Sequence, residues 1–185
     1  HDKNYEATQY AIQVAKDNGC LISFDPNLRL SLWKTPEEAR RRILYGMKQC
    51  DIMKISEEEV AFVSEQESLE KGVSFIRDNS DIKILFVTLG NKGSIAYYKD
   101  EKIYCGGIHQ EHVVDTTGAG DTFCGAVLSR ILELGTDALT EKDIREMLLF
   151  ANAAASIVVT RKGALCSMPE PEEIRAATSL IDKVL

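Results

Sequence analysis

The chain has 185 residues, of which 44% are hydrophobic and 28% are charged, and its formal net charge at pH 7 is −7. Its length suits one globular domain with its own core. The negative charge argues against nucleic acid or an anionic membrane as a main partner, and no apolar run approaches the length that spans a bilayer. The five cysteines are odd in number and form no C-x-x-C pair, so neither a zinc site nor a disulfide framework is expected. Thiols without such partners suit a reducing compartment, and we therefore expect a cytoplasmic protein.

The first half of the chain is predicted to alternate between helices and strands. Thr35, Pro36 and Glu38 form the pattern of a capping box with proline at the first helical position, and Ser56 precedes three glutamates that suit a helix start. In the first predicted helix, Tyr10 and Val14 belong to one apolar face. The predicted elements are helices over 2–18, 35–49, from 56 onwards and over 69–78, and strands over 21–24, 51–55 and 82–89.

The second half is predicted to contain a hairpin followed by helices. The order of all elements, with strands and helices alternating before late helices, predicts an α/β fold. We expect a layered, Rossmann-like and mostly parallel sheet that is flanked by helices and joined by right-handed crossovers. The predicted elements of this half are strands over 94–98 and 102–108 joined at 99–101, and helices over 119–134, 140–159 and from 172 onwards.

The most informative segment is the run Asp115–Asp121, Asp-Thr-Thr-Gly-Ala-Gly-Asp, at the start of a predicted helix. Small residues at a helix start leave backbone N–H groups uncovered, and the helix dipole favours negative charge there. The N–H groups of Gly118, Ala119 and Gly120 are therefore predicted to bind an anion. Asp121 would repel a bound phosphate unless it accepts a proton from a hydroxyl that attacks the phosphorus. The alternative is a capped helix after a glycine-rich turn.

This run resembles the signature of the ribokinase-like (PfkB) carbohydrate kinases, in which the last Asp is the catalytic base. The similarity extends over residues 113–126, and the run differs from both the Walker A and the dinucleotide-binding patterns. The resemblance implies a ribokinase-like fold, ATP as phosphoryl donor, Mg²⁺ on its phosphates and Asp121 as the base.

The resemblance also implies that residues 1–185 are the C-terminal, nucleotide-binding and catalytic part of the family's domain. Nothing in the chain is similar to the family's first strands or to its small sugar-binding lid, and a crossover helix over 2–18 needs a preceding strand. We therefore expect the chain alone to be inactive. A homodimer, where one forms, is expected through the missing lid.

Residues 25–29, Asp-Pro-Asn-Leu-Arg, follow a predicted strand, where ligands bind in such sheets. They resemble a stretch of fructokinases and of 2-keto-3-deoxygluconate kinases in which the Arg lies near the substrate or the transferring phosphate. The resemblance assigns Arg29, with Asp25 and Asn27, to the substrate, because a guanidinium can hold phosphate oxygens in two places. A plain loop after a strand is the alternative.

Ser56 and Glu59 occupy the positions of the family's Asn-x-x-Glu pattern. The resemblance places Ser56 where the family has an Asn near the nucleotide, and Glu59 matches the Glu that reaches magnesium through water. Ordinary helix capping explains the same residues. The other nucleotide positions that the resemblance implies are Thr88, Gly90 and Gly93 in a turn and Asn152 on a small-residue helix, and a tight turn and helix packing are their alternatives.

A monovalent cation site, for K⁺, is the last implication of the resemblance. Its ligands are oxygens only, which suits a hard cation, and a cation there would hold the anion-binding backbone in shape. A plain turn after a helix is the alternative. The positions are Asp115, Thr117, Val158, Arg161, Gly163 and Ser167.

The predicted function is an ATP-dependent carbohydrate kinase, foremost a fructokinase that converts fructose to fructose 6-phosphate. The Lys-Ile-Ser form of residues 54–56 favours fructose, and 2-keto-3-deoxygluconate kinase or another sugar kinase of the family is the alternative. A non-catalytic nucleotide-binding module is the alternative from another class. Asp121 argues against that module, because a site that only binds gains nothing from a carboxylate in an anion hole.

Overall fold

The computed structural model describes residues 2–181, which form two compact units, one up to Phe86 and the other from Val87 onwards. The strands follow one another in the order β1-β2-β3-β4-β5 in a mixed sheet, and helices flank it. The prediction of an α/β fold is therefore confirmed. Among the helices described over these residues, none is both long enough and apolar enough to cross a membrane.

The first unit alternates between helices and strands, as predicted. β1 and β2 are parallel neighbours, with Ser23 opposite Ile52 and Phe24 opposite Met53. Met47, Met53 and Ile76 are fully buried in the core. The elements are α1 (Asp2–Asp17), β1 (Ser23–Phe24), the 3₁₀ turn η1 (Leu30–Leu32), α2 (Pro36–Met47), β2 (Ile52–Ser56), α3 (Glu57–Ser64), α4 (Leu69–Asp78) and β3 (Ile84–Thr88), which continues into the second unit.

The apolar face that the sequence predicted for α1 is largely exposed among the described residues. Tyr10 is 74% exposed and Val14 is 42% exposed. The helix instead meets α2 through Tyr5, whose ring stacks edge-on against Tyr45 at a centroid distance of 5.5 Å. The guanidinium carbon of Arg42 lies 3.5 Å from the centre of the Tyr5 ring, which adds a cation–π contact.

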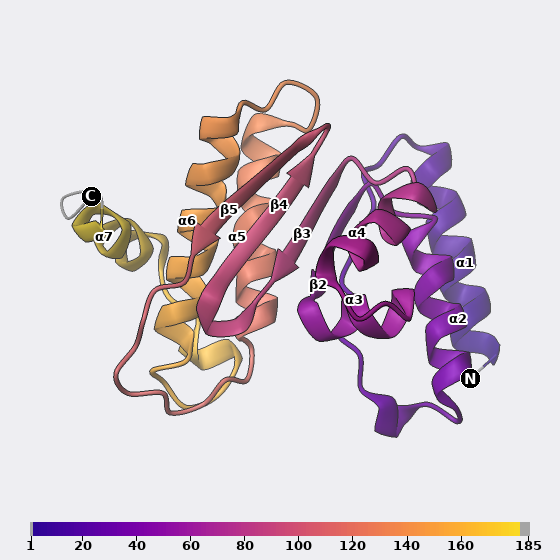
Figure 1. Cartoon of the computed structure of the whole chain (residues 1–185), viewed down its shortest axis with the longest axis horizontal. Coiled ribbons are helices and arrows are strands. Elements are labelled where there is room, and N and C mark those ends of the chain that lie inside the picture. Colours follow the sequence, from indigo (N-terminus) through magenta and orange to yellow (C-terminus); the bar gives the residue numbers. More distant parts are fainter. Residues whose placement is uncertain (1, 182–185) are drawn as a thin grey trace. The chain divides into compact units, whose positions relative to one another are not determined.

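The second unit is a hairpin covered by helices. β4 and β5 are antiparallel from Gly93 opposite Gly106 to Tyr98 opposite Glu101, so the hairpin turns at Lys99 and Asp100. α6 packs on both strands and on α5 (Figure 1). The elements are the 3₁₀ turn η2 (Gly90–Lys92), β4 (Gly93–Tyr98), β5 (Glu101–Gly106), α5 (Ala119–Leu134), α6 (Glu141–Val158), the 3₁₀ turn η3 (Leu165–Ser167) and α7 (Pro171–Ile181).

Candidate active site

The predicted anion-binding segment begins α5. Gly118 is the N-cap with a φ of 84°, a left-handed conformation that glycine adopts without strain, and its carbonyl accepts the N–H of Thr122 at 2.8 Å. The N–H groups of Gly120 and Asp121 lie in the first turn, where a helix offers no acceptor of its own. Ala119 differs from the prediction, because its N–H donates to the carbonyl of Thr116 at 3.3 Å. Asp121 is exposed, as a proton acceptor for a bound hydroxyl must be.

The segment before α5 is fastened to the loop that follows α6. The N–H groups of Val114 and Asp115 donate to the carbonyl of Val159 at 2.8 and 3.2 Å. The Asp115 carboxylate accepts the N–H of Thr117 at 2.9 Å and the N–H of Gly163 at 3.3 Å. Hydrogen bonds from Thr117 first, and then from Gly163, hold the pKa of Asp115 below its ordinary value, so this carboxylate is ionised at neutral pH.

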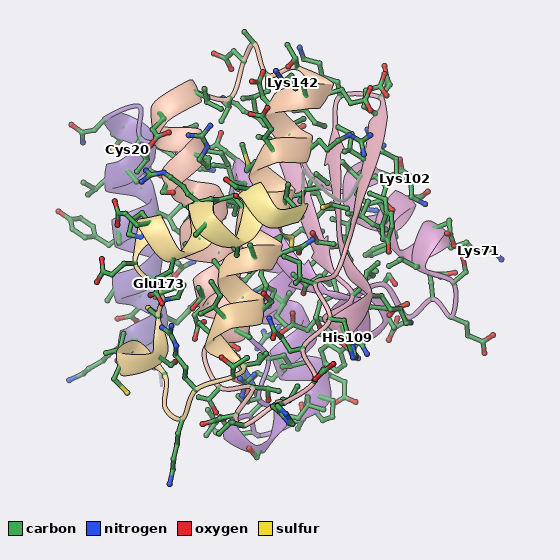
Figure 2. The ribbon with its side chains drawn as sticks, turned by 90° about the vertical axis from the view of Figure 1, so that its left-hand side faces the viewer. Cys20, Lys71, Lys102, His109, Lys142 and Glu173 are labelled. Atoms are coloured by element: carbon green, nitrogen blue, oxygen red, sulfur yellow. The ribbon has the colours of Figure 1, made fainter. Side chains whose placement is uncertain are left out.

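Close packing also requires the glycine at the start of α5. A Cβ on Gly118 would lie 3.4 Å from the Cα of Ala164, in addition to the strain of its positive φ. The turn that is predicted to bind an anion is therefore placed by its contacts with the 159–167 loop. That loop is in turn tied to α7, since Arg161 forms an ion pair with Glu173, which Figure 2 labels on the first turns of α7.

The residues assigned to a cation gather in this same region. Ser167 is almost completely buried, and its hydroxyl donates to the carbonyls of Gly163 at 2.5 Å and Ala164 at 2.7 Å. The carbonyl of Val158 accepts the N–H of Arg161 at 3.0 Å. The described residues contain no group of three or more His, Cys, Asp or Glu side chains that could hold a metal ion. A cation here would therefore rely on carbonyl and hydroxyl oxygens together with Asp115.

The turn assigned to the nucleotide follows β3. Thr88 ends that strand half-buried, and the N–H of Leu89 donates to the carbonyl of Gly93 at 2.8 Å, which closes the turn. Gly90 and Gly93 both have positive φ, at 60° and 104°. A Cβ on Gly93 would lie 2.2 Å from the carbonyl oxygen of Cys105, so β5 excludes any other residue there.

Asn152, assigned to the purine, has its amide engaged inside the protein. Its carbonyl oxygen accepts the hydroxyl of Ser94 at 2.9 Å, and its NH₂ group donates to the carbonyls of Cys105 and Gly106, each at 3.2 Å. The residue is 7% exposed. Its side chain therefore joins α6 to both strands of the hairpin. Such contacts are expected from the alternative to a purine contact, in which this small-residue helix packs tightly inside the protein.

In the first unit, a second polar cluster forms where β1 and β2 end. Lys54 and Asp25 form a largely buried ion pair with a separation of 3.1 Å. Burial raises the pKa of Asp25, and the charge of Lys54 opposes that effect. Sequence reasoning used Lys54 only as part of the Lys-Ile-Ser form and did not predict its ion pair, because a lysine in an otherwise apolar strand does not indicate its partner.

Glu59 connects this cluster to the loop that precedes η1. One carboxylate oxygen accepts the N–H of Ser56 at 2.9 Å and completes a capping box, while the other accepts the N–H of Leu28 at 2.6 Å. Arg29 is exposed, and its guanidinium donates to the carbonyl of Leu28 at 3.0 Å. Asn27 has a φ of 43° and donates its N–H to Asp25 at 3.2 Å. The structure therefore brings together Asp25, Asn27, Arg29, Ser56 and Glu59 in the first unit, and in the second it brings together the α5 turn and the 159–167 loop.

Comparison with known proteins identifies the chain's relatives. The model of the pfkB family carbohydrate kinases matches residues 2–171. Fructokinase-1 of Oryza sativa subsp. japonica is 42% identical over 166 residues, which cover 89% of this chain and 50% of that protein. The chain spans about half the length of most of the curated relatives it matches.

Solved structures give the same result. The fructokinase double mutant from Vibrio cholerae O395, in a form with bound fructose, ADP and potassium ion, is 32% identical with a TM-score of 0.85, over 94% of this chain and 55% of that one. A putative ribokinase II from E. coli in complex with ATP and Mg²⁺ is 31% identical with a TM-score of 0.79, over 94% of this chain and 53% of that one.

Proposed function

Because the chain belongs to the pfkB family of carbohydrate kinases, we propose that the protein transfers the γ-phosphoryl group of ATP to a sugar, with fructose as the substrate. The similarity to fructokinases, at about 40% identity, supports this choice of sugar. The observation that carries the proposal is the position of Asp121. An exposed carboxylate in the first turn of α5, next to N–H groups that suit an anion, matches the needs of phosphoryl transfer.

Asp121 takes the proton of the attacking sugar hydroxyl in this proposal. The hydroxyl oxygen forms a bond to the γ-phosphorus, the bond from that phosphorus to the bridging oxygen of ADP breaks, and ADP leaves. The N–H groups of Gly120 and Asp121 stabilise the charge on the transferring group. The resemblance assigns Arg29 to the substrate. Because the transition state is loose, positioning contributes more than the basicity of Asp121.

The residues present fit the ligands that this chemistry needs. ATP and Mg²⁺ are bound by the E. coli relative, and potassium by the Vibrio fructokinase. Mg²⁺ neutralises charge on the phosphates, and the resemblance places Glu59 near it through water. For K⁺, Asp115, Gly163 and Ser167 contribute a carboxylate, a carbonyl and a hydroxyl in one region. Thr88, Gly90, Gly93 and Ser56 remain the residues proposed for the nucleotide.

A cytoplasmic location is part of the proposal. All five cysteines are free thiols, two of them exposed, as a reducing compartment would keep them.

The test is an ADP-release assay on the product of the complete gene, with fructose, 2-keto-3-deoxygluconate and ribose as acceptors. Asp121→Asn should lower kcat by a factor of roughly 10²–10⁴, while ADP binding is kept or tightened because a negative charge has left the phosphate site. Asp78→Asn, an exposed carboxylate at the end of α4, is the matched control and should behave as wild type. Wild-type turnover in Asp121→Asn would falsify the role of this residue.

A further inference from the structure

The two carboxylate oxygens of Glu59 hold two segments that are far apart in the sequence. Oε2 accepts the N–H of Ser56 three residues earlier, within the capping box of α3. Oε1 accepts the N–H of Leu28, 31 residues earlier, at 2.6 Å. Glu59 is only 9% exposed, so water competes little for these two hydrogen bonds. A helix cap alone needs the first of these bonds and not the second.

The segment that Glu59 holds has no regular structure of its own. Residues 25–29 lie between β1 and η1, and Asn27 adopts a left-handed φ of 43°, which asparagine visits more readily than most residues. Two contacts with the end of β2 and the start of α3 hold this loop. Asp25 pairs with Lys54, and Leu28 donates to Glu59. These contacts, together with the bond from the Asn27 N–H to Asp25, define the shape of the loop.

The peptide groups of Leu28 connect Glu59 to Arg29. The N–H of Leu28 points to Glu59, and the carbonyl of Leu28 accepts the guanidinium of Arg29 at 3.0 Å. A guanidinium carries five N–H donors, so this bond orients the group while donors remain for a ligand. Arg29 is also the N-cap of η1, with a φ of −129°. Because Arg29 directly follows Leu28 in the chain, a shift of the Leu28 peptide also moves the backbone of Arg29.

We propose that Glu59 is a positioning residue, which fixes the guanidinium of Arg29 for a phosphate-bearing ligand by holding the N–H of Leu28. The inference rests on the proposed kinase function, in which the resemblance assigns Arg29 to the substrate or the transferring phosphate. It gives Glu59 a task in addition to the magnesium contact through water that the resemblance implies. Each oxygen of Glu59 already accepts a strong backbone bond, and the side chain faces the loop and the helix cap.

Glu59→Gln tests this role with the smallest change of shape. An amide has one acceptor oxygen, so one of the two N–H groups must face an NH₂ group instead. We expect kcat/KM for ATP to fall at least tenfold in the wild-type background, and less than threefold when Arg29 is already alanine. Amide hydrogen exchange over residues 26–30 should become at least tenfold faster.

Asp143→Asn is the matched control. Asp143 closes the capping box of α6 by accepting the N–H of Thr140 at 2.8 Å, so its replacement breaks an equivalent helix cap in the other unit. Its kinetics should equal those of wild type. An equal loss of activity from Glu59→Gln with and without Arg29 would overturn the proposal in favour of a general structural role.

A tenfold rise in the Mg²⁺ requirement of Glu59→Gln without faster exchange over residues 26–30 would overturn the proposal in favour of metal binding alone. A wild-type protein that releases no ADP with any sugar refutes the kinase proposal instead. Hydrogen exchange then decides on the contact alone: faster exchange over residues 26–30 in Glu59→Gln supports it, and unchanged exchange refutes it.

Discussion

The hydroxyl of Ser94 in β4 donates a hydrogen bond of 2.9 Å to the side-chain oxygen of Asn152 in α6, 58 residues away. Both residues are buried. The same amide donates to the carbonyls at the end of β5, so one side chain satisfies polar groups on both strands of the hairpin. The position of α6 on the hairpin therefore depends on Asn152.

Asn152→Ala should lower the free energy of unfolding by about 2–4 kcal/mol, because it leaves the Ser94 hydroxyl and two carbonyls without this partner. Urea unfolding measures the change. Asn79→Ala is the control, since the exposed amide of Asn79 makes a single bond to Phe75, and it should cost less than about 1 kcal/mol. The double variant Ser94→Ala with Asn152→Ala should be no less stable than Asn152→Ala alone. A double variant that loses the sum of both single effects would contradict this account.

Local signals in the sequence were sufficient for most elements. The cap at Ser56 and the glycine stop at Gly135 appear in the structure where they were predicted. β1 is shorter than predicted, because residues 21 and 22 leave the strand geometry and the Ile22 N–H is taken by the side chain of Asp51 at 2.9 Å. Tyr10 and Val14, on the apolar face predicted for α1, are exposed among the described residues, because periodicity assigns residues to a face but does not show what covers that face.

The candidate site was predictable as a set of residues but not as a set of contacts. The spacing from Ser56 to Glu59 predicted a helix cap, and nothing near Glu59 in the sequence indicates its bond to Leu28. The resemblance implied a purine contact for Asn152, and a polar residue among alanines gives no information on whether its partner is a ligand or a buried strand. Both contacts join segments that only the folded chain brings together.

Asp115 should contribute stability that depends on pH. Its folded-state pKa lies below the ordinary value of 3.8, chiefly because of hydrogen bonds from Thr117. A lowered pKa means that the stabilisation is fully present above the unfolded value and is lost as the pH falls through the folded value. In urea unfolding, the difference between wild type and Asp115→Asn should be constant from pH 5 to 7 and shrink below about pH 3.8.

Asp143→Asn should show the same pH dependence, because Thr140 lowers the pKa of Asp143 in the same way. A difference between wild type and Asp115→Asn that does not change with pH would show that Asp115 has no such linkage.

The cysteines should differ strongly in reactivity. Burial raises the pKa of Cys50 to about 12, and the thiolate is the reactive form. Cys20 and Cys166 are exposed. Iodoacetamide labelling at pH 8, followed by mass spectrometry, should modify the two exposed thiols well before Cys50, and all five should react at similar rates in urea. Early labelling of Cys50 in the folded protein would contradict its burial behind α2.

Gly118 lies just before α5, and Gly125 lies within it. Alanine should have opposite effects on stability at these two positions. At Gly118, a φ of 84° costs alanine about 1–2 kcal/mol, and its Cβ would press on Ala164 at 3.4 Å. The displaced turn should also lower kcat/KM, because the N–H groups that we propose for the phosphate move with it. At Gly125, an added Cβ meets nothing within 4 Å, so alanine should stabilise the helix by about 1 kcal/mol and leave the kinetics unchanged. Urea unfolding and the ADP-release assay on both variants measure the contrast. If Gly118→Ala were as stable and as active as Gly125→Ala, neither the left-handed conformation nor the contact with Ala164 would be needed to shape the anion-binding turn.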